Sequence, residues 1–141
     1  MLNGPNLNLL GLREPELYGC ATYADLERFI GEEAARLGVE AEVRQSNHEG
    51  VLVDWIQSAF GKFDGIVLNA AAYTHTSVAI LDALKAVRIR TVEVHLTEPR
   101  EREDFRRVSY VGMVAEKTFS GLGFKSYSAA MEYLAKSGEC S

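Results

Sequence analysis

The sequence predicts an α/β protein built as one domain around a parallel sheet. Short apolar or β-branched runs alternate with amphipathic stretches along the whole chain, and no repeat, low-complexity tract or linker interrupts them. A length of 141 residues is typical of one domain. Strands that alternate with helices require right-handed crossovers, which place helices on both faces of the sheet. We therefore expect residues 1–141 to form one flavodoxin-like three-layer sandwich with a five-stranded parallel sheet in the order 2-1-3-4-5.

The predicted strands are short. Five segments carry the strand pattern, at residues 1–2, 39–45, 65–69, 91–95 and 117–121. The first has only Met1 and Leu2, so we expect a first strand that is truncated at its N-terminal end. In the expected order this strand is central, and its neighbours depend on it for their backbone hydrogen bonds.

Four amphipathic helices are expected between the strands. Thr22 and Asp25 form a capping box ahead of the first helix, and Gly38 ends it. The apolar face of that helix comprises Leu26, Phe29, Ile30, Ala34 and Leu37. The other helices are expected at residues 51–60, 77–87 and 126–137.

Composition argues against several classes of partner. A net charge of −5 makes nucleic acid and anionic membranes poor general partners. The sequence has no apolar run of about 18 residues, the length of a membrane span, and its first residues lack the pattern of a signal peptide. Cys20 and Cys140 are too few and too far apart for a disulfide framework or a zinc site. We expect a protein of the reducing cytoplasm.

Polar residues follow the predicted strands. In parallel sheets of this class ligands bind beyond the carboxyl ends of the strands. All three histidines and several asparagines are at such positions: Asn3, Asn6, Asn47, His48, Asn69, His75 and His95. Each alone is explained by a turn or a helix cap. Their convergence on one edge of the predicted sheet favours a functional site.

Two further segments contribute to this hypothesis. The connection that contains residues 11–19 is longer than the usual strand-to-helix loop, and connections of that length are often lids or binding loops. It carries Arg13 and Tyr18 between two glycines that could act as hinges. Residues 98–107 mix charges of both signs, as a solvated helix would. If the acidic chain binds an anion, Arg13 and Arg106 are the candidates that reverse the local field.

Residues 3–11, NGPNLNLLG, are followed by Arg13-Glu14-Pro15 and by Tyr18-Gly19, and this run strongly resembles type II 3-dehydroquinate dehydratase. Later segments resemble the same family in register: residues 44–50, 54–56, 73–77, 93–96 and 105–106. The resemblance covers nearly the whole chain, and several spaced motifs are far more specific than any one of them.

The resemblance implies a hydro-lyase of the shikimate pathway, which serves aromatic amino-acid biosynthesis. Such an enzyme dehydrates 3-dehydroquinate to 3-dehydroshikimate by anti elimination through an enolate. It uses no metal or organic cofactor, and it forms dodecamers built from trimers. These properties are expectations for this chain.

The resemblance also implies the catalytic roles. Tyr18 would be the base that removes the C2 proton, and Arg13 on the lid would hold Tyr18 as a phenolate. Asn6 would place a water molecule against the enolate oxygen. His95 would protonate the leaving hydroxyl, with Glu93 orienting its ring.

Six further residues are implied in substrate binding: Asn69, His75, Asp82, Leu96, Thr97 and Arg106. Asn69 and the backbone N–H groups of Leu96 and Thr97 would hold the carboxylate. His75 and Arg106 would hold the ring hydroxyls, and Asp82 would reach toward the site of a neighbouring subunit.

The residue types are sufficient for this chemistry. A free tyrosine has a pKa of about 10, so ionising it at neutral pH requires about 4 kcal/mol. One cation at about 4 Å and an effective dielectric constant of about 20 supplies that energy. Arg13 can do so only when the lid is closed. A histidine near its reference pKa of about 6.5 can protonate the leaving hydroxyl.

Two other functions remain open on the sequence alone. A metal-dependent hydrolase would use His48, His75 and His95 as ligands, but the chain lacks a helical His-x-x-x-His pair. A non-catalytic flavodoxin-like module, such as a receiver domain, would need acidic residues after the first and third strands. Asn6 and Asn69 stand there instead.

Overall fold

The computed structural model describes residues 1–12 and 14–138. Five parallel strands form one sheet in the order β2-β1-β3-β4-β5, which confirms the predicted fold. The strands are β1 (Leu2–Asn3), β2 (Arg44–Gln45), β3 (Gly65–Asn69), β4 (Arg90–Val94) and β5 (Lys117–Phe119).

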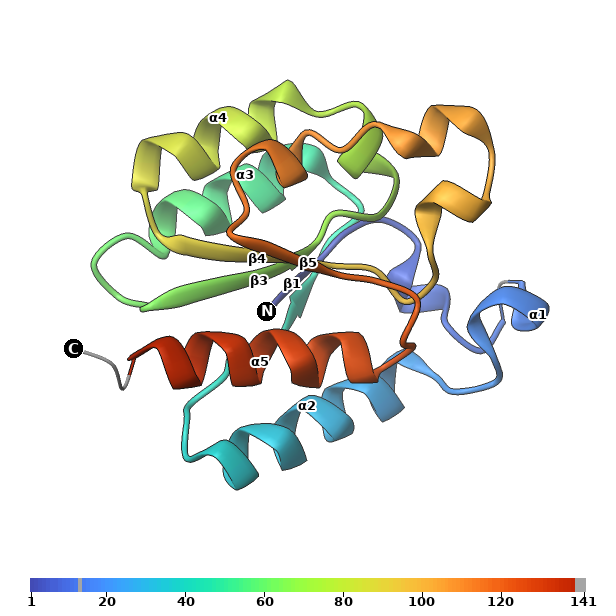
Figure 1. Cartoon of the computed structure of the whole chain (residues 1–141), viewed down its shortest axis with the longest axis horizontal. Coiled ribbons are helices and arrows are strands. Elements are labelled where there is room, and N and C mark those ends of the chain that lie inside the picture. The colour runs from blue at the N-terminus through green and yellow to red at the C-terminus, as the bar shows by residue number, and fades with distance from the viewer. Residues whose placement is uncertain (13, 139–141) are drawn as a thin grey trace.

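Helices cover both faces of the sheet. They are α1 (Pro15–Tyr18), α2 (Tyr23–Leu37), α3 (Glu49–Ser58), α4 (Val78–Val87) and α5 (Lys125–Gly138). Helices α3 and α4 pack on one face, and α2 and α5 on the other (Figure 1). Short 3-10 helices, which the sequence did not predict, form in the connections: Leu7–Leu9, Ala71–His75, Pro99–Glu101, Asp104–Arg107 and Val111–Met113. None of the described helices is long and apolar enough to cross a membrane.

The predicted boundaries of α2 are confirmed by its caps. The backbone N–H of Asp25 donates to Thr22 Oγ1 at 3.1 Å, and the N–H of Thr22 donates to an Asp25 carboxylate oxygen at 2.9 Å. Gly38 ends the helix with φ of 70°, a left-handed conformation in which glycine avoids the strain of a side chain.

The strand expected at residues 39–45 is wrong in length, because only Arg44–Gln45 pair. The cause is the partner. β2 is an edge strand whose neighbour β1 offers two residues, in the register Leu2 with Arg44 and Asn3 with Gln45. β1 has only two residues, yet it pairs on both sides, since it also lies in register with Leu68 and Asn69 of β3.

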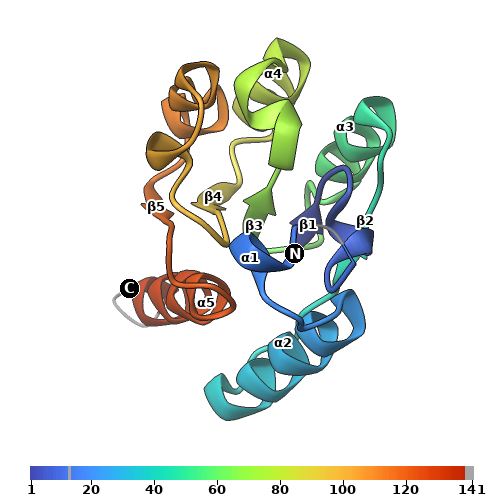
Figure 2. The same cartoon turned by 90° about the vertical axis from the view of Figure 1, so that its right-hand side faces the viewer.

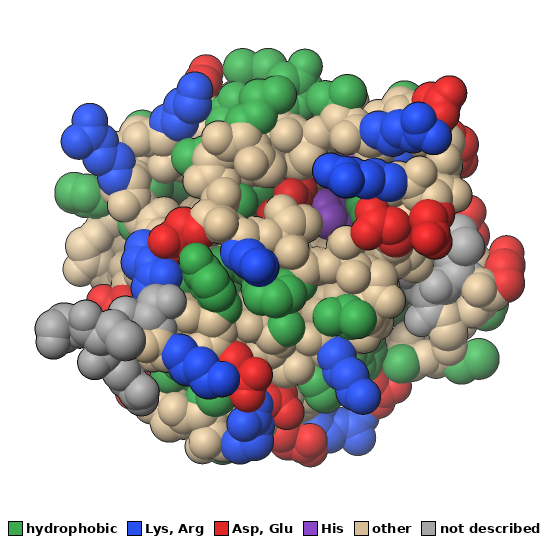
Figure 3. Space-filling view, viewed as in Figure 1, with side chains coloured by type: hydrophobic (Ala, Val, Ile, Leu, Met, Phe, Trp, Pro, Cys, Tyr) green, Lys and Arg blue, Asp and Glu red, His purple; other side chains and the backbone are tan. Residues whose placement is uncertain are grey.

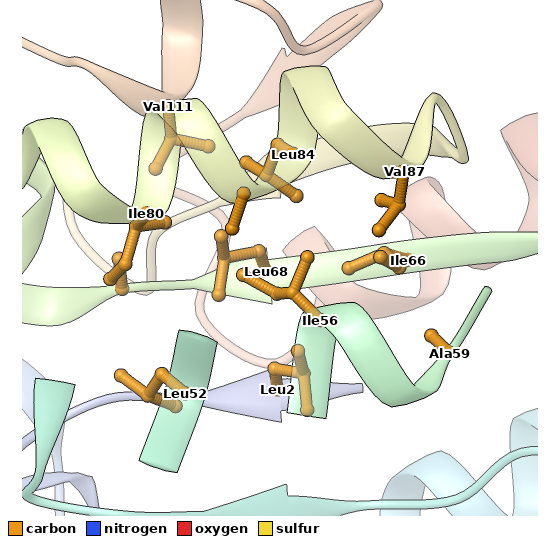
Figure 4. Packing of buried hydrophobic residues seen from close by; sticks show 12 residues of the cluster. Leu2, Leu52, Ile56, Ala59, Ile66, Leu68, Ile80, Leu84, Val87 and Val111 are labelled. Carbon is orange, nitrogen blue, oxygen red and sulfur yellow. The ribbon is translucent and has the colours of Figure 1, made fainter. Parts of the chain in front are cut away.

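Two hydrophobic clusters hold the layers together. Between the sheet and helices α3 and α4 lie Leu2, Leu52, Ile56, Ile66, Leu68, Ile80 and Leu84 (Figure 4). Leu26, Ile30, Val67, Val92, Val94 and Tyr127 fill the opposite side. Strand β3 alternates between the clusters, with Ile66 and Leu68 in one and Val67 in the other, as expected for a strand buried on both faces. This packing holds the carboxyl ends of β3 and β4 in place, and the polar residues Asn69 and His95 lie at these ends.

Candidate active site

A cleft opens beyond the carboxyl ends of the strands, where the sequence predicted the site. Its lining comes from the connections after β1, β3 and β4: Pro5, Asn6, Leu7, Asn69, Ala71, Ala72, His75, His95, Leu96, Thr97, Pro99, Arg102 and Arg106. Seven predicted site residues are therefore brought together. Figure 3 shows a histidine in a hollow of the surface, between basic and acidic side chains.

Glu93 and His95 form a buried pair at the end of β4. His95 Nε2 lies 2.9 Å from Glu93 Oε2, and Glu93 is 2% exposed. Ser109 donates a hydroxyl hydrogen bond to the same oxygen, and Thr118 donates to Glu93 Oε1 at 2.9 Å. Burial alone would raise the pKa of Glu93, but His95 and the two hydroxyls outweigh it and hold that pKa below its usual value. Glu93 is therefore a carboxylate at neutral pH.

Asn69, the last residue of β3, is held by a buried polar network. Its Nδ2 donates to the Tyr127 hydroxyl at 3.0 Å, and its Oδ1 accepts the N–H of Ala71 at 3.2 Å. The Tyr127 hydroxyl in turn donates to Asn3 Oδ1 at 2.6 Å. Desolvation raises the pKa of Tyr127, so its proton stays in place to make this bond. These bonds fix the orientation of the Asn69 amide and use one of the two N–H groups of Nδ2.

The turn after β1 brings Asn6 to the cleft. Asn6 adopts a left-handed conformation with φ of 69°, and its N–H donates to Asn47 Oδ1 at 3.0 Å. The backbone of Gly4 packs against the backbone of Ala70, which follows β3. A Cβ on Gly4 would lie only 2.4 Å from the carbonyl oxygen of Ala70. Only glycine allows that approach.

His75 and Arg106 both line the cleft. His75 Nδ1 donates to the carbonyl oxygen of Val108 at 2.7 Å. Burial is the main cause that lowers the pKa of His75, and the neighbouring His95 and Arg106 lower it further. The ring is thus neutral at neutral pH, and its Nε2 can accept a hydrogen bond from a hydroxyl group. Arg106 Nε donates to Glu103 at 2.6 Å.

The connection with the predicted lid lies beyond the strand ends, where both views place α1 (Figure 1; Figure 2). Glu14 forms an ion pair with Arg102 of the cleft at 3.5 Å. Tyr18 is the last residue of α1, and Arg13 lies outside the described residues. The roles expected for Tyr18 and Arg13 therefore stay predictions.

Two other candidates lie outside this cleft. Asp82 is exposed on α4 and does not line the cleft, and its expected role toward a neighbouring subunit stays a prediction. His48 is exposed at the start of α3, away from His75 and His95. Within residues 1–12 and 14–138, no three or more His, Cys, Asp or Glu side chains are grouped to hold a metal ion.

Sequence reasoning missed four residues that shape the site: Arg102, Ser109, Thr118 and Tyr127. Arg102 belongs to the mixed-charge stretch interpreted as solvated, yet its side chain is only 15% exposed. A signal for it existed, since an acidic chain that binds an anion needs local cations. The contacts of Ser109, Thr118 and Tyr127 depend on tertiary structure, and no local pattern marks them.

A doubly wound parallel sheet with a polar cleft at its carboxyl edge and a buried carboxylate–histidine pair defines an α/β enzyme. Comparison with known proteins is more specific. Residues 1–135 match the family Dehydroquinase class II. The 3-dehydroquinate dehydratase of Phenylobacterium zucineum is 55% identical over 94% of this chain and 91% of its own. The enzyme of that name from Bartonella henselae is 52% identical over 96% and 92%.

Solved structures agree. The type II dehydroquinase of Butyrivibrio crossotus superimposes with a TM-score of 0.92 at 45% identity, over 94% of this chain and 93% of that one. A 3-dehydroquinate dehydratase-like protein from Bifidobacterium longum gives 0.72 at 32% identity, over 96% and 92%. The chain belongs to the class II dehydroquinase family.

Proposed function

We propose that this chain is a hydro-lyase that dehydrates 3-dehydroquinate to 3-dehydroshikimate in the shikimate pathway. The observation that carries the proposal is the Glu93–His95 pair at the cleft of a class II dehydroquinase fold. Neither alternative function gains support. The cleft brings together neutral asparagines rather than the acidic cluster of a receiver domain, and His48 is absent from it.

In the proposed mechanism Tyr18, held as a phenolate by Arg13, removes the C2 proton next to the ketone. Charge moves to the ketone oxygen and forms an enolate, which a water molecule placed by Asn6 stabilises. The enolate then expels the hydroxyl group on the opposite face. His95, whose ring Glu93 orients, gives that group a proton, so water leaves.

Substrate binding follows from the positions of the polar groups. We infer that Asn69 and the backbone N–H groups of Leu96 and Thr97, all residues that line the cleft, bind the carboxylate. His75 and Arg106 line the same cleft and would bind the ring hydroxyls, with neutral His75 as an acceptor. The mechanism needs no metal or organic cofactor.

We further propose that the chain assembles into a dodecamer built from trimers and acts in the cytoplasm. The family resemblance supports this proposal. The exposure of Asp82 on α4 is consistent with a contact to a neighbouring site. Light scattering that shows only monomer at micromolar concentration, in a sample with full activity, would contradict the assembly.

The proposed activity is tested by adding 3-dehydroquinate and following the ultraviolet absorbance of the conjugated enone product. We expect turnover that persists after dialysis against a chelator. Folded protein that gives no rise in absorbance would overturn the proposal, and activity restored only by an added metal would contradict the metal-free mechanism.

A further inference from the structure

The hydroxyl of Ser109 lies where three groups meet. Its oxygen accepts the backbone N–H of Gly112 at 2.9 Å. The same hydroxyl bonds Glu93 Oε2, the oxygen that also bonds His95 Nε2. Ser109 follows the 3-10 helix Asp104–Arg107 and so comes from a different part of the chain than strand β4.

The direction of each hydrogen bond in this junction is determined. A backbone N–H only donates, so the bond from Gly112 uses a lone pair of the Ser109 oxygen. The single Ser109 proton is then available for Glu93, which must accept it as a carboxylate. A carboxylate oxygen only accepts, so the third bond requires a proton on His95 Nε2. In the neutral ring, Nδ1 is then the basic nitrogen, which takes up and returns a proton.

We propose that Ser109 is a positioning residue that orients the Glu93 carboxylate and, through it, fixes the tautomer of His95. Ser109 itself need not touch the substrate. The catalytic part of this inference rests on the proposed dehydration, whereas the tautomer of His95 does not depend on it.

Thr118 supplies an internal comparison. It donates to Oε1, the carboxylate oxygen that does not bond His95. It also stands on the exposed edge strand β5, where water can replace its hydroxyl, whereas Ser109 is half-buried. Loss of the Ser109 hydroxyl should therefore disturb His95 more than loss of the Thr118 hydroxyl.

Nuclear magnetic resonance of ¹⁵N-histidine-labelled protein tests the tautomer directly, because the chain has only three histidines. The wild type should show neutral His95 protonated at Nε2. Ser109→Ala should give a mixture of tautomers, and Thr118→Val a smaller change. Ser128→Ala is the matched control, since that hydroxyl donates to the carbonyl oxygen of Lys125 within α5 and Ser128 does not line the cleft. A His95 tautomer unchanged in Ser109→Ala would overturn the proposal.

A double-mutant cycle with Glu93→Gln tests the path of the effect. A hydrogen bond to a charged group is worth about a tenfold effect or more, so Ser109→Ala should lower kcat at least about tenfold with little change in KM. In the Glu93→Gln background the same substitution should cost less than about twofold, because its target is gone. Equal losses in both backgrounds would show that Ser109 acts independently of Glu93. Wild-type protein without activity would instead refute the proposed function and leave the tautomer result standing.

Discussion

Asn69 and Glu93 stand at the ends of β3 and β4 and are almost completely buried and hydrogen-bonded on both sides. Asn6 and Glu14 stand on the connection after β1, where Asn6 is exposed and the Glu14 side chain is 40% exposed. The side of the site that contains Asn69 and Glu93, here called the sheet wall, is thus part of the folded core. The connection after β1, with Asn6 and Glu14, is here called the loop wall, and we expect it to rearrange more easily than the sheet. The difference suggests a division of labour, in which the sheet wall holds the substrate and the acid, and the loop wall brings the base.

The largest expected effect separates base from acid. Tyr18→Phe should lower kcat by at least about a hundred- to ten-thousand-fold, the usual value of general acid–base catalysis. This variant should neither dehydrate the substrate nor exchange its C2 proton with deuterated water. His95→Ala should dehydrate equally poorly but still exchange that proton, because proton removal precedes loss of water. Rapid exchange by Tyr18→Phe would remove Tyr18 as the base.

Arg13→Ala tests whether the loop wall acts on the base rather than on binding. If Arg13 holds Tyr18 as a phenolate, kcat should fall about a hundredfold when this cation is lost. The affinity for product, measured by calorimetry, should change little, since the proposed binding residues lie mainly on the sheet wall. A loss confined to KM would make Arg13 a binding residue.

Tyr127→Phe tests the sheet wall, and here we expect changes in stability and in KM rather than in kcat. The variant leaves Asn3 Oδ1 and Asn69 Nδ2 without their buried partner, so the free energy of unfolding should fall by about 1–3 kcal/mol. With the Asn69 amide free to turn, KM should rise about three- to tenfold, with kcat nearly unchanged. A thermal unfolding curve and initial rates measured on one preparation separate the two effects. An unchanged KM would mean that Asn69 does not need this network.

The smallest effect should come from the ion pair between Glu14 and Arg102. The Glu14 side chain is 40% exposed, and such pairs are worth at most about 1 kcal/mol. Glu14→Gln should therefore change kcat less than about fivefold, and the difference from wild type should vanish at high salt. A larger, salt-independent loss would show that the loop wall is as firmly held as the sheet wall.

The sequence predicted best what local physics decides. The capping box of Thr22 and Asp25, the stop at Gly38 and the apolar run of β3 each depend on neighbours in the chain, and all are confirmed. The length of β2 was wrong because it depends on β1, a partner about 40 residues away in sequence.

The site shows the same division. Residues that follow strands, such as Asn69 and His95, were found because chain position and fold place them at one edge. Ser109 and Tyr127 were missed because their hydrogen bonds join segments that are distant in sequence. The buried Arg102 was missed because a run of mixed charge normally stays in water.

The hydrogen bond from Tyr127 to Asn3 joins the last helix to the first strand, 124 positions apart. During synthesis the N-terminal turn emerges first, yet β1 cannot pair with β3 until residue 69 has been made, and Asn3 cannot receive its hydroxyl until residue 127 has been made. A nascent or prematurely terminated chain that lacks α5 would thus carry every residue that lines the cleft and still lack the support beneath it. Messages truncated near their 3′ end should yield polypeptides that are inactive, although none of their cleft residues is missing.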